Sequence, residues 1–232
     1  MNKILVICAH PDDECLGLAG TLRRYVLSGD EVYCLILGTG LASRMQKYTH
    51  DDILSISQFD YSQELCGLQN DAKAASETIG FKYVKLLLNP DNAFDTVSLL
   101  SIIKSIECYL YMWKPEIVFT HHSGDLNIDH RLTYQAVMTA CRPGCSAVKD
   151  IYAFETPSST EWAFDGSFKP NAFVDISQTI NDKLKAMECY TTEIREYPHP
   201  RSLRALKSRA EYWGQIAGVE YAEAFELVRK IT

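Results

Sequence analysis

Two short stretches of the sequence concentrate histidine and carboxylate side chains. The first, AHPDDE at residues 9–14, directly follows the apolar run ILVIC, and the second, HHSGDLNIDH at residues 121–130, follows the run EIVFT. Placing several charged groups side by side after a buried segment is unfavourable unless something binds them. Both stretches are therefore candidates for a metal-binding or catalytic pocket.

The first stretch and the end of the second together offer three metal ligands. His10 and Asp13 lie three residues apart across a predicted strand-to-helix turn, so both side chains can reach one point, and His130 opens a second predicted helix. Two imidazoles and one carboxylate leave a fourth tetrahedral position free, which is typical of a catalytic zinc site. Zinc in such a site acidifies a water molecule and polarises a carbonyl. The adjacent Asp12 would then be free to act as a general base.

Each of these residues also has a simpler structural explanation. His10 could mark a helix entry, Asp12 or Asp13 could be a helix cap, and Asp129 with His130 could be a cap followed by a surface histidine. Two histidines and one carboxylate also suit non-haem iron, although such sites usually use an H-x-D/E spacing. The sequence has neither a G-x-G-x-x-G fingerprint nor a nucleophile elbow, so dinucleotide binding and covalent catalysis are not favoured.

The elements that must position these residues follow from the alternation of apolar runs with segments of helical spacing. We predict strands at residues 3–9, 32–37, 83–88 and 116–120, and helices over 14–28, 58–79, 97–113 and 129–141. This alternation indicates an α/β, Rossmann-like, mostly parallel sheet with helices on both faces. In the order 3-2-1-4, strands 1 and 4 are neighbours at the switch point, where ligands bind beyond the carboxyl ends. The two His/Asp-rich stretches would thus meet in one crevice.

The pattern changes from residue 150 onward. The stretch IYAFETPSSTEW is followed by a predicted strand over 172–176 and by helical segments over 177–193 and 201–230. No Pro/Gly/Ser-rich linker separates this part from the rest. We therefore predict a C-terminal extension of one domain spanning residues 1–232.

Composition narrows the class of protein and its partners. The chain has 232 residues, of which 47% are hydrophobic, and a formal net charge of −7. No basic block stands out, which argues against nucleic acid as a partner. The apolar run after Lys3 is too short for a signal peptide or a membrane span. The eight cysteines are scattered without a C-x-x-C pair, which indicates a reduced, cytoplasmic protein. A homo-oligomer is possible, and the sequence leaves the oligomeric state open.

At this point the residues resemble a known family. AHPDDE after the first strand, with DLNIDHR later, resembles the PIG-L/LmbE-type zinc-dependent deacetylases, which remove acetyl groups from N-acetylglucosamine units and related amino-sugar conjugates. The resemblance extends over most of the chain through ILGTGLASR (36–44), NPDNAFD (89–95), PNAFVDIS (170–177) and HPRSLRAL (199–206). It implies one Zn²⁺ per chain, with Fe²⁺ as an alternative, held by His10, Asp13 and His130. It also implies Asp12 as general base and a small amino-sugar substrate.

The sequence departs from the family pattern at one position. Many members read H-P-D-H in the second motif, where the first histidine stabilises the oxyanion, whereas this chain has Asn127. Asn127 can donate a hydrogen bond but cannot carry a proton, and Asp129, which usually orients that histidine, needs another partner. Protonated Asp12 or His199, on a loop that could fold over the crevice, would then return a proton to the leaving amine.

Three further residues are candidates for substrate binding. Arg44 and Asp95 lie in loops after the second and third predicted strands, and Arg201 lies in the HPRS segment. Arg44 and Asp95 could bind sugar hydroxyls or a phosphate, although solvated loop charges explain them equally well. The segment of Arg201 resembles one near the active-site mouth in the family, although Pro198 and Pro200 also indicate a plain turn before a helix. The predicted function is a hydrolase that removes an N-acetyl group from an amino sugar and releases acetate. The alternatives are an amidase acting on a non-sugar conjugate and a catalytically silent sugar-binding relative.

Overall fold

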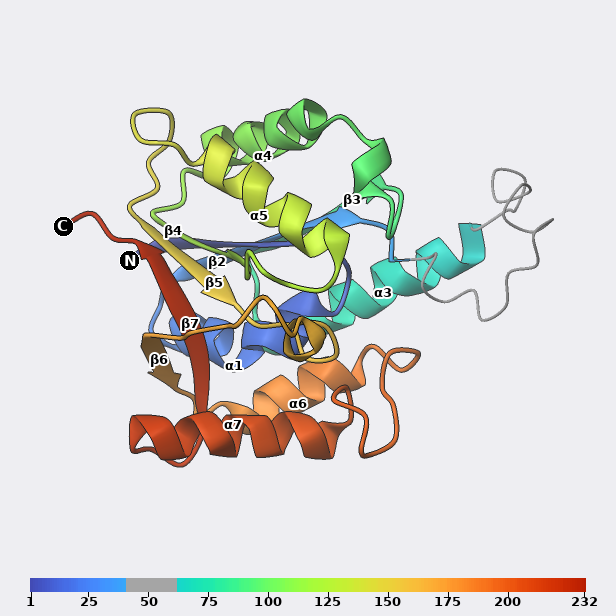
Figure 1. Cartoon of the computed structure of the whole chain (residues 1–232), viewed down its shortest axis with the longest axis vertical. Coiled ribbons are helices and arrows are strands. Elements are labelled where there is room, and N and C mark those ends of the chain that lie inside the picture. Colours follow the sequence, from blue (N-terminus) through green and yellow to red (C-terminus); the bar gives the residue numbers. More distant parts are fainter. Residues whose placement is uncertain (41–61) are drawn as a thin grey trace.

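A seven-stranded sheet forms the centre of the computed structural model, which describes residues 1–40 and 62–232 (Figure 1). The strands are β1 (Lys3–Cys8), β2 (Glu31–Gly38), β3 (Tyr83–Asn89), β4 (Ile117–His121), β5 (Asp150–Phe154), β6 (Ala172–Asp175) and β7 (Ala222–Arg229). Their order is β3-β2-β1-β4-β5-β7-β6, and β1 to β5 run parallel while β7 is antiparallel to both neighbours. The predicted Rossmann-like fold is confirmed, including the pairing of β1 with β4.

Helices cover both faces of the sheet. They are α1 (Asp13–Leu27), α3 (Ser62–Ile79), α4 (Leu99–Trp113), α5 (Ile128–Ala140), α6 (Ile180–Glu188) and α7 (Leu203–Ala217), with short 3-10 turns at Phe94–Thr96 and Thr160–Trp162. The pair α4 and α5 lies on one face, α1, α3 and α6 lie on the other, and α7 packs beside α6 and β7 (Figure 1). Because both faces are covered, β1 and β2 are buried along almost their whole length, which explains their continuous apolar sequences.

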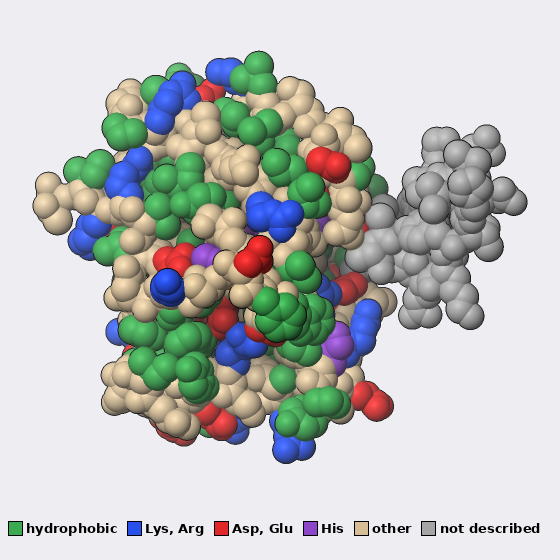
Figure 2. Space-filling model, in the orientation of Figure 1, with side chains coloured by type: hydrophobic (Ala, Val, Ile, Leu, Met, Phe, Trp, Pro, Cys, Tyr) green, Lys and Arg blue, Asp and Glu red, His purple; other side chains and the backbone are tan. Residues whose placement is uncertain are grey.

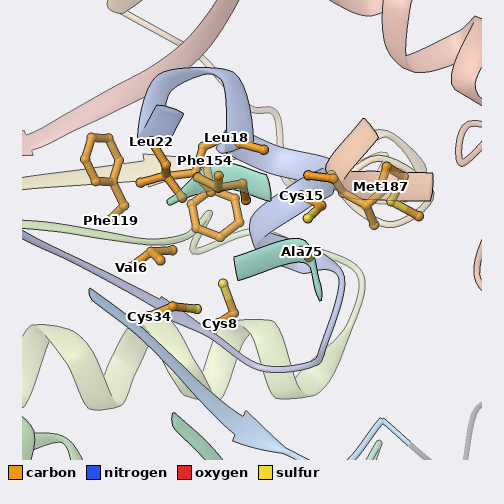
Figure 3. Packing of buried hydrophobic residues seen from close by; sticks show 14 of the residues in the cluster. Val6, Cys8, Cys15, Leu18, Leu22, Cys34, Ala75, Phe119, Phe154 and Met187 are labelled. Carbon is orange, nitrogen blue, oxygen red and sulfur yellow. The ribbon is translucent and has the colours of Figure 1, made fainter. Parts of the chain in front are cut away.

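The face under α1, α3 and α6 holds a large hydrophobic cluster. Leu18 and Leu22 of α1 pack over Phe119 and Phe154 of the sheet, and Met187 of α6 closes the cluster (Figure 3). Three cysteines, Cys8, Cys15 and Cys34, are fully buried in the same cluster and pack there as small apolar side chains (Figure 3). The packing therefore fixes the first turn of α1 firmly against the end of β1.

Helix α1 is broken near its middle, and a buried ion pair makes hydrogen bonds to backbone groups on both sides of the break. Leu18 has a non-helical φ of −151°. Glu223 of β7 accepts hydrogen bonds from two backbone N–H groups just after the break, at 3.2 and 2.7 Å. Lys183 of α6 donates to the carbonyl of Leu16 at 2.9 Å and pairs with Glu223 at 2.5 Å. The C-terminal part of the chain thus completes the helix that carries the first motif.

The helix predicted over 201–230 is wrong beyond residue 217. Gly218 adopts a left-handed conformation with φ of 76° and ends α7, as glycine does at many helix C-termini. Residues Ala222–Arg229 then form β7, which is inserted between β5 and β6. The segment predicted as helical over 177–193 contains only the shorter α6, Ile180–Glu188. The start of the helix predicted over 58–79 and most of the preceding loop lie outside the described residues.

The surface has a mixed character. On the face seen in Figure 2, basic and acidic side chains are interspersed with hydrophobic ones, without a broad basic area. Within residues 1–40 and 62–232, no helix has the length and apolar character needed to span a bilayer.

Candidate metal centre and active site

The turn between β1 and α1 separates the two aspartates of the first motif. Asp12 has a left-handed backbone with φ of 105°, a conformation that residues other than glycine rarely adopt outside functional sites. Its side chain lines a cavity of about 220 Å³. Asp13 is 0% exposed, and its Oδ2 accepts a hydrogen bond from the backbone N–H of His10 at 2.8 Å. The two carboxylates therefore occupy different environments, although they are neighbours in sequence.

Three side chains from the two motifs converge on one point. His10 Nδ1 lies 3.6 Å from Asp13 Oδ2, His130 Nε2 lies 3.5 Å from that same oxygen, and the two ring nitrogens are 3.3 Å apart. Neighbouring ligands in a tetrahedral zinc site with bonds of about 2.0–2.1 Å lie about 3.3–3.4 Å apart. The structure thus brings together the three predicted ligands at the spacing that such a site requires.

Carboxylates lie beside the ring nitrogens of His10 and His130 that point away from Asp13. His10 Nε2 lies 3.0 Å from Asp129 and 2.9 Å from Asp91, and His130 Nδ1 lies 3.0 Å from Asp125. Ionised carboxylates only accept hydrogen bonds, so these nitrogens carry the protons and the opposite nitrogens turn lone pairs toward Asp13. Carboxylate–histidine pairs of this kind orient metal ligands in proteins.

Three observations indicate that the residues present fit a cation. His10 Nδ1 and His130 Nε2 face each other, and with each ring proton on the far nitrogen both would present lone pairs, which is unfavourable unless a proton or a metal ion lies between them. Asp13 Oδ1 is buried and makes no hydrogen bond in the described part of the chain. Burial alone lowers the pKa of His10, but Asp129 and Asp91 outweigh it and raise that pKa well above its ordinary value. The site therefore favours a cation at this position.

Asp125 is itself fixed by the loop that follows β5. Ser159 and Thr160 donate hydroxyl hydrogen bonds to its two oxygens, the second at 2.5 Å. Burial opposes ionisation, yet these bonds and His130 lower the pKa of Asp125 to about 2. The carboxylate behind His130 is therefore ionised at neutral pH.

His121, at the end of β4, supports the site without belonging to the ligand set. Its Nε2 accepts the backbone N–H of Ala9 at 2.9 Å, and its Nδ1 lies 3.1 Å from the hydroxyl of Thr156. Its ring stacks on His130 at 3.9 Å between centroids. Burial, with the neighbouring His130, lowers the pKa of His121 to about 4, so the ring is neutral at pH 7.

The cavity lies directly over this cluster. Its described lining includes residues from both motifs, from the loop after β3, from the loop after β5 and from the segment before α7: His10, Pro11, Asp12, Gly40, Asp91, Asn92, Leu126, Asn127, His130, Ser158, Ser159, Trp162, Glu193 and Arg201. Arg201 is the only arginine or lysine among them. Burial raises the pKa of Asp12 well above its usual range, although Arg201 lies beside it.

Two predicted residues of the second motif have definite partners. Asn127 caps α5, because its Oδ1 accepts the backbone N–H of Asp129 at 2.8 Å, and its Nδ2 donates to Asn92 at 3.1 Å. The partner that the sequence left open for Asp129 is His10, while its other oxygen accepts the backbone N–H of Phe94 at 2.9 Å.

The structure does not bring all the predicted residues to the cavity. Among the described residues, neither His199 nor Asp95 lines it, and Asp95 is exposed. The Nδ1 of His199 accepts the backbone N–H of Arg201 at 3.1 Å, and burial together with Arg201 lowers the pKa of His199. Arg201 does line the cavity. Arg44 lies outside the described residues.

Sequence reasoning missed three acids that surround the site. Asp91 lies four residues before the predicted Asp95 in the same NPDNAFD segment, and Glu193 belongs to a stretch with no recognisable motif. Asp125 was part of the quoted second stretch but received no role. The only feature of the sequence that indicates the contact between Asp125 and His130 is their separation by five residues.

Comparison with known families agrees with this geometry. The profile of the PIG-L family, described as GlcNAc-PI de-N-acetylase, matches residues 5–141, which is more than half of the chain and includes both motifs. The chain belongs to the PIG-L family. It is an enzyme of a family whose members deacetylate N-acetylated sugar conjugates.

Individual relatives extend the similarity to the C-terminal part. The diacetylchitobiose deacetylase of Thermococcus kodakarensis is 26% identical over 237 residues, which cover 98% of this chain and 84% of that protein. The N,N'-diacetylchitobiose deacetylase of Pyrococcus horikoshii has a TM-score of 0.75 at 20% identity, covering 98% of this chain and 84% of its own. GalB, the 4-carboxy-2-hydroxymuconate hydratase of Pseudomonas putida, has a TM-score of 0.75 at 19% identity, covering 100% and 98%. A hydratase among these folds means that the fold alone does not select the reaction.

Proposed function

We propose that this protein is a zinc-dependent N-deacetylase that removes the acetyl group from an N-acetylglucosamine-type sugar and releases acetate. The observation that supports this most directly is the spacing of 3.3–3.6 Å among His10, Asp13 and His130 beside the cavity that Asp12 lines. Two histidines and one carboxylate are a ligand set for catalytic zinc, and Fe²⁺ is the alternative that the same donors accept.

The side chains around the cavity divide the work of amide hydrolysis. A divalent ion held by His10, Asp13 and His130 would polarise the acetamide carbonyl and acidify a water molecule. Asp12 takes the proton from the attacking water, because it is the carboxylate of the first motif that lines the cavity. The Nδ2 of Asn127 lies at the same cavity and can donate a hydrogen bond to the oxygen of the tetrahedral intermediate.

The proton for the leaving amine comes from Asp12 in this proposal. Asn127 carries no titratable proton, and His199 is not among the described residues that line the cavity. Asp12 would therefore act first as base and then as acid on the same substrate, which general acid–base catalysis permits when one group reaches both atoms.

The charges around the cavity favour a neutral substrate for the first assays. The described lining contains the acids Asp12, Asp91 and Glu193 and a single arginine, Arg201, which pairs with two of these acids. Exposed Leu126 and Trp162 add apolar surface at the same cavity, which suits the faces of a sugar ring. We also propose one domain in a cytoplasmic setting, which the scattered, unpaired cysteines support.

The decisive test is acetate release by the purified, zinc-loaded protein. N,N'-diacetylchitobiose, a methyl glycoside of N-acetylglucosamine and UDP-N-acetylglucosamine serve as sugar substrates, and a non-sugar acetamide tests the amidase alternative. We expect acetate and a free amine from a neutral sugar. Hydrolysis of the non-sugar acetamide alone would favour the amidase. Sugar binding without acetate release would favour the silent relative.

A further inference from the structure

Arg201 lies in the segment between α6 and α7, far in sequence from both motifs, yet it reaches the catalytic cavity. Its Nη1 lies 3.0 Å from Asp12 Oδ2 and 2.5 Å from Glu193 Oε2. Its Nε donates to the hydroxyl of Ser158 at 2.8 Å. The guanidinium is thus held by three side chains from three different parts of the chain.

Two of these contacts are hydrogen bonds, from Nη1 to Glu193 and from Nε to Ser158, whereas Asp12 Oδ2 faces Nη1 as an ion pair without a hydrogen bond. Asp12 is 2% exposed and Glu193 is 5% exposed, while the Arg201 side chain is 24% exposed. Arginine presents its donors in a rigid planar fork, so contacts at both Nε and Nη1 fix the orientation of the group. Ser158, which receives the Nε contact, is itself held in a left-handed turn by hydrogen bonds from its N–H to Glu161 at 3.0 Å.

The positive charge of Arg201 is already balanced by neighbouring carboxylates, so the site is poorly suited to binding a substrate anion. Two buried carboxylates already face its Nη1, and binding a phosphate there would require one of them to give up its partner. The geometry instead suits a group that holds Asp12. Glu193 accepts a hydrogen bond from the same Nη1 and so holds the guanidinium in place beside Asp12.

We propose that Arg201, held by Glu193 and Ser158, is a positioning residue that orients the Asp12 carboxylate toward the attacking water. This inference rests on the proposed function, in which Asp12 transfers the protons. The C-terminal segment then contributes to proton transfer a part that neither His/Asp motif contains. Arg201 itself touches neither the water nor the substrate in this role.

Kinetics of two variants separate positioning from substrate binding. We expect Arg201→Ala to lower kcat by roughly 10–100-fold with little change in KM, because misplacing a catalytic group by about 1 Å costs about that much. Arg201→Lys keeps the charge but not the fork, so it should recover only part of the loss. Millimolar guanidinium should partly restore the kcat of Arg201→Ala. Metal content, measured by elemental analysis, should stay at the wild-type level in both variants.

A matched control removes a similar side chain far from the cavity. Arg229 of β7 is partly buried and donates to the carbonyls of Cys141 and Val148 at 2.6 and 2.8 Å. We expect Arg229→Ala to lower the melting temperature without a change in kcat and without any response to guanidinium. A rise in KM at unchanged kcat in Arg201→Ala would overturn the proposal in favour of substrate binding. Loss of kcat without guanidinium rescue would overturn it in favour of a structural role.

A measurement that needs no turnover distinguishes this proposal from the proposed function. In protein labelled with ¹³C at aspartate Cγ, the Asp12 resonance is assigned as the one that Asp12→Asn removes. We expect Arg201→Lys to shift this resonance and Arg229→Ala to leave it in place. An unshifted resonance would contradict the role of Arg201 even in an active enzyme. A shifted resonance in a protein that releases no acetate from any sugar would contradict the deacetylase function and not the contact.

Discussion

At the scale of residues, the first motif assigns different tasks to adjacent side chains. Asp13 is enclosed by three histidines, which lower its pKa well below the usual range although burial opposes this. Asp12 lies across a strained left-handed turn and faces the cavity with Arg201. The strain of that turn, typically about 1–3 kcal/mol, is the cost of pointing two neighbouring carboxylates at different targets.

Substitution of each aspartate should therefore have a different effect. Asp13→Ala removes one of the three proposed ligands and should abolish stoichiometric metal binding. Asp12→Asn should retain about one metal ion per chain and lose roughly 10²–10⁴ in kcat, which is the usual contribution of a general base. Elemental analysis and acetate release measure the two quantities. Near-normal turnover of Asp12→Asn would mean that another group takes the proton.

Asn127 caps α5 and has a chemical role in the proposed function, and two variants separate these contributions. Asn127→Ala removes both the α5 cap and the Nδ2 donor, so it should lose about 0.5–2 kcal/mol of stability and about 10²–10³ in kcat. Asn127→Asp keeps the capping oxygen, loses the donor and adds a negative charge at the cavity. It should therefore retain stability in urea unfolding and still lose rate. Full turnover of Asn127→Asp would show that the amide does not stabilise the intermediate.

At the scale of elements, the broken helix α1 depends on residues far away in sequence. Lys183 and Glu223 are almost completely buried and satisfy backbone groups on either side of the break. A buried ion pair is weak evidence for stability as a whole, but removing one partner leaves an uncompensated charge. The fold around the first motif is therefore sensitive to either partner alone.

We expect Lys183→Met to lower the free energy of unfolding by about 3–5 kcal/mol, because it leaves the Glu223 carboxylate buried without a cation. Urea denaturation measures this loss. Lys82→Met, which removes an exposed pair with Glu31 at the surface, is the matched control and should change stability little. Adding Glu223→Gln to Lys183→Met should recover part of the loss, and strictly additive losses would contradict this coupling.

The helices and strands that could be predicted are those whose hydrophobic pattern is compatible with only one kind of element. Residues 4–8 are continuously apolar, and only a strand buried on both faces explains such a short run. Switch-point topology then placed His10, Asp13 and His130 together. In contrast, AEAFELVR is compatible with helix or strand, and only pairing with β5 and β6 decides for β7. Asp91 and Glu193 could not be assigned, because their roles depend on loop geometry that carries no periodic pattern.

At the scale of the whole molecule, metal binding and folding are linked. The three proposed ligands come from the turn after β1, the first residue of α1 and the start of α5, so an unfolded chain does not present them together. A ligand that binds only the folded state stabilises it, by about 2.7 kcal/mol at a hundredfold excess over Kd. Metal occupancy should therefore contribute directly to the stability of the sheet.

Removing the metal should lower the melting temperature by several degrees, because 1 kcal/mol corresponds to roughly 2–4 °C for a domain of this size. Calorimetry with and without a chelator, followed by zinc addition, measures the change. Asp13→Ala should melt at the same temperature in both conditions. An equal response of wild type and Asp13→Ala to the chelator would mean that the relevant metal binds elsewhere.

The position of β7 in the sheet has a consequence for the nascent chain. Among the residues that the structure describes, β6 pairs only with β7, and β7 is synthesised after it, so β6 lacks this partner until residues 222–229 have emerged from the ribosome. The same strand carries Glu223, which completes the helix that begins at Asp13. Completion of the helix that carries the first motif thus depends on β7, and we expect stable binding of the proposed zinc ion only after residues 222–229 have emerged from the ribosome.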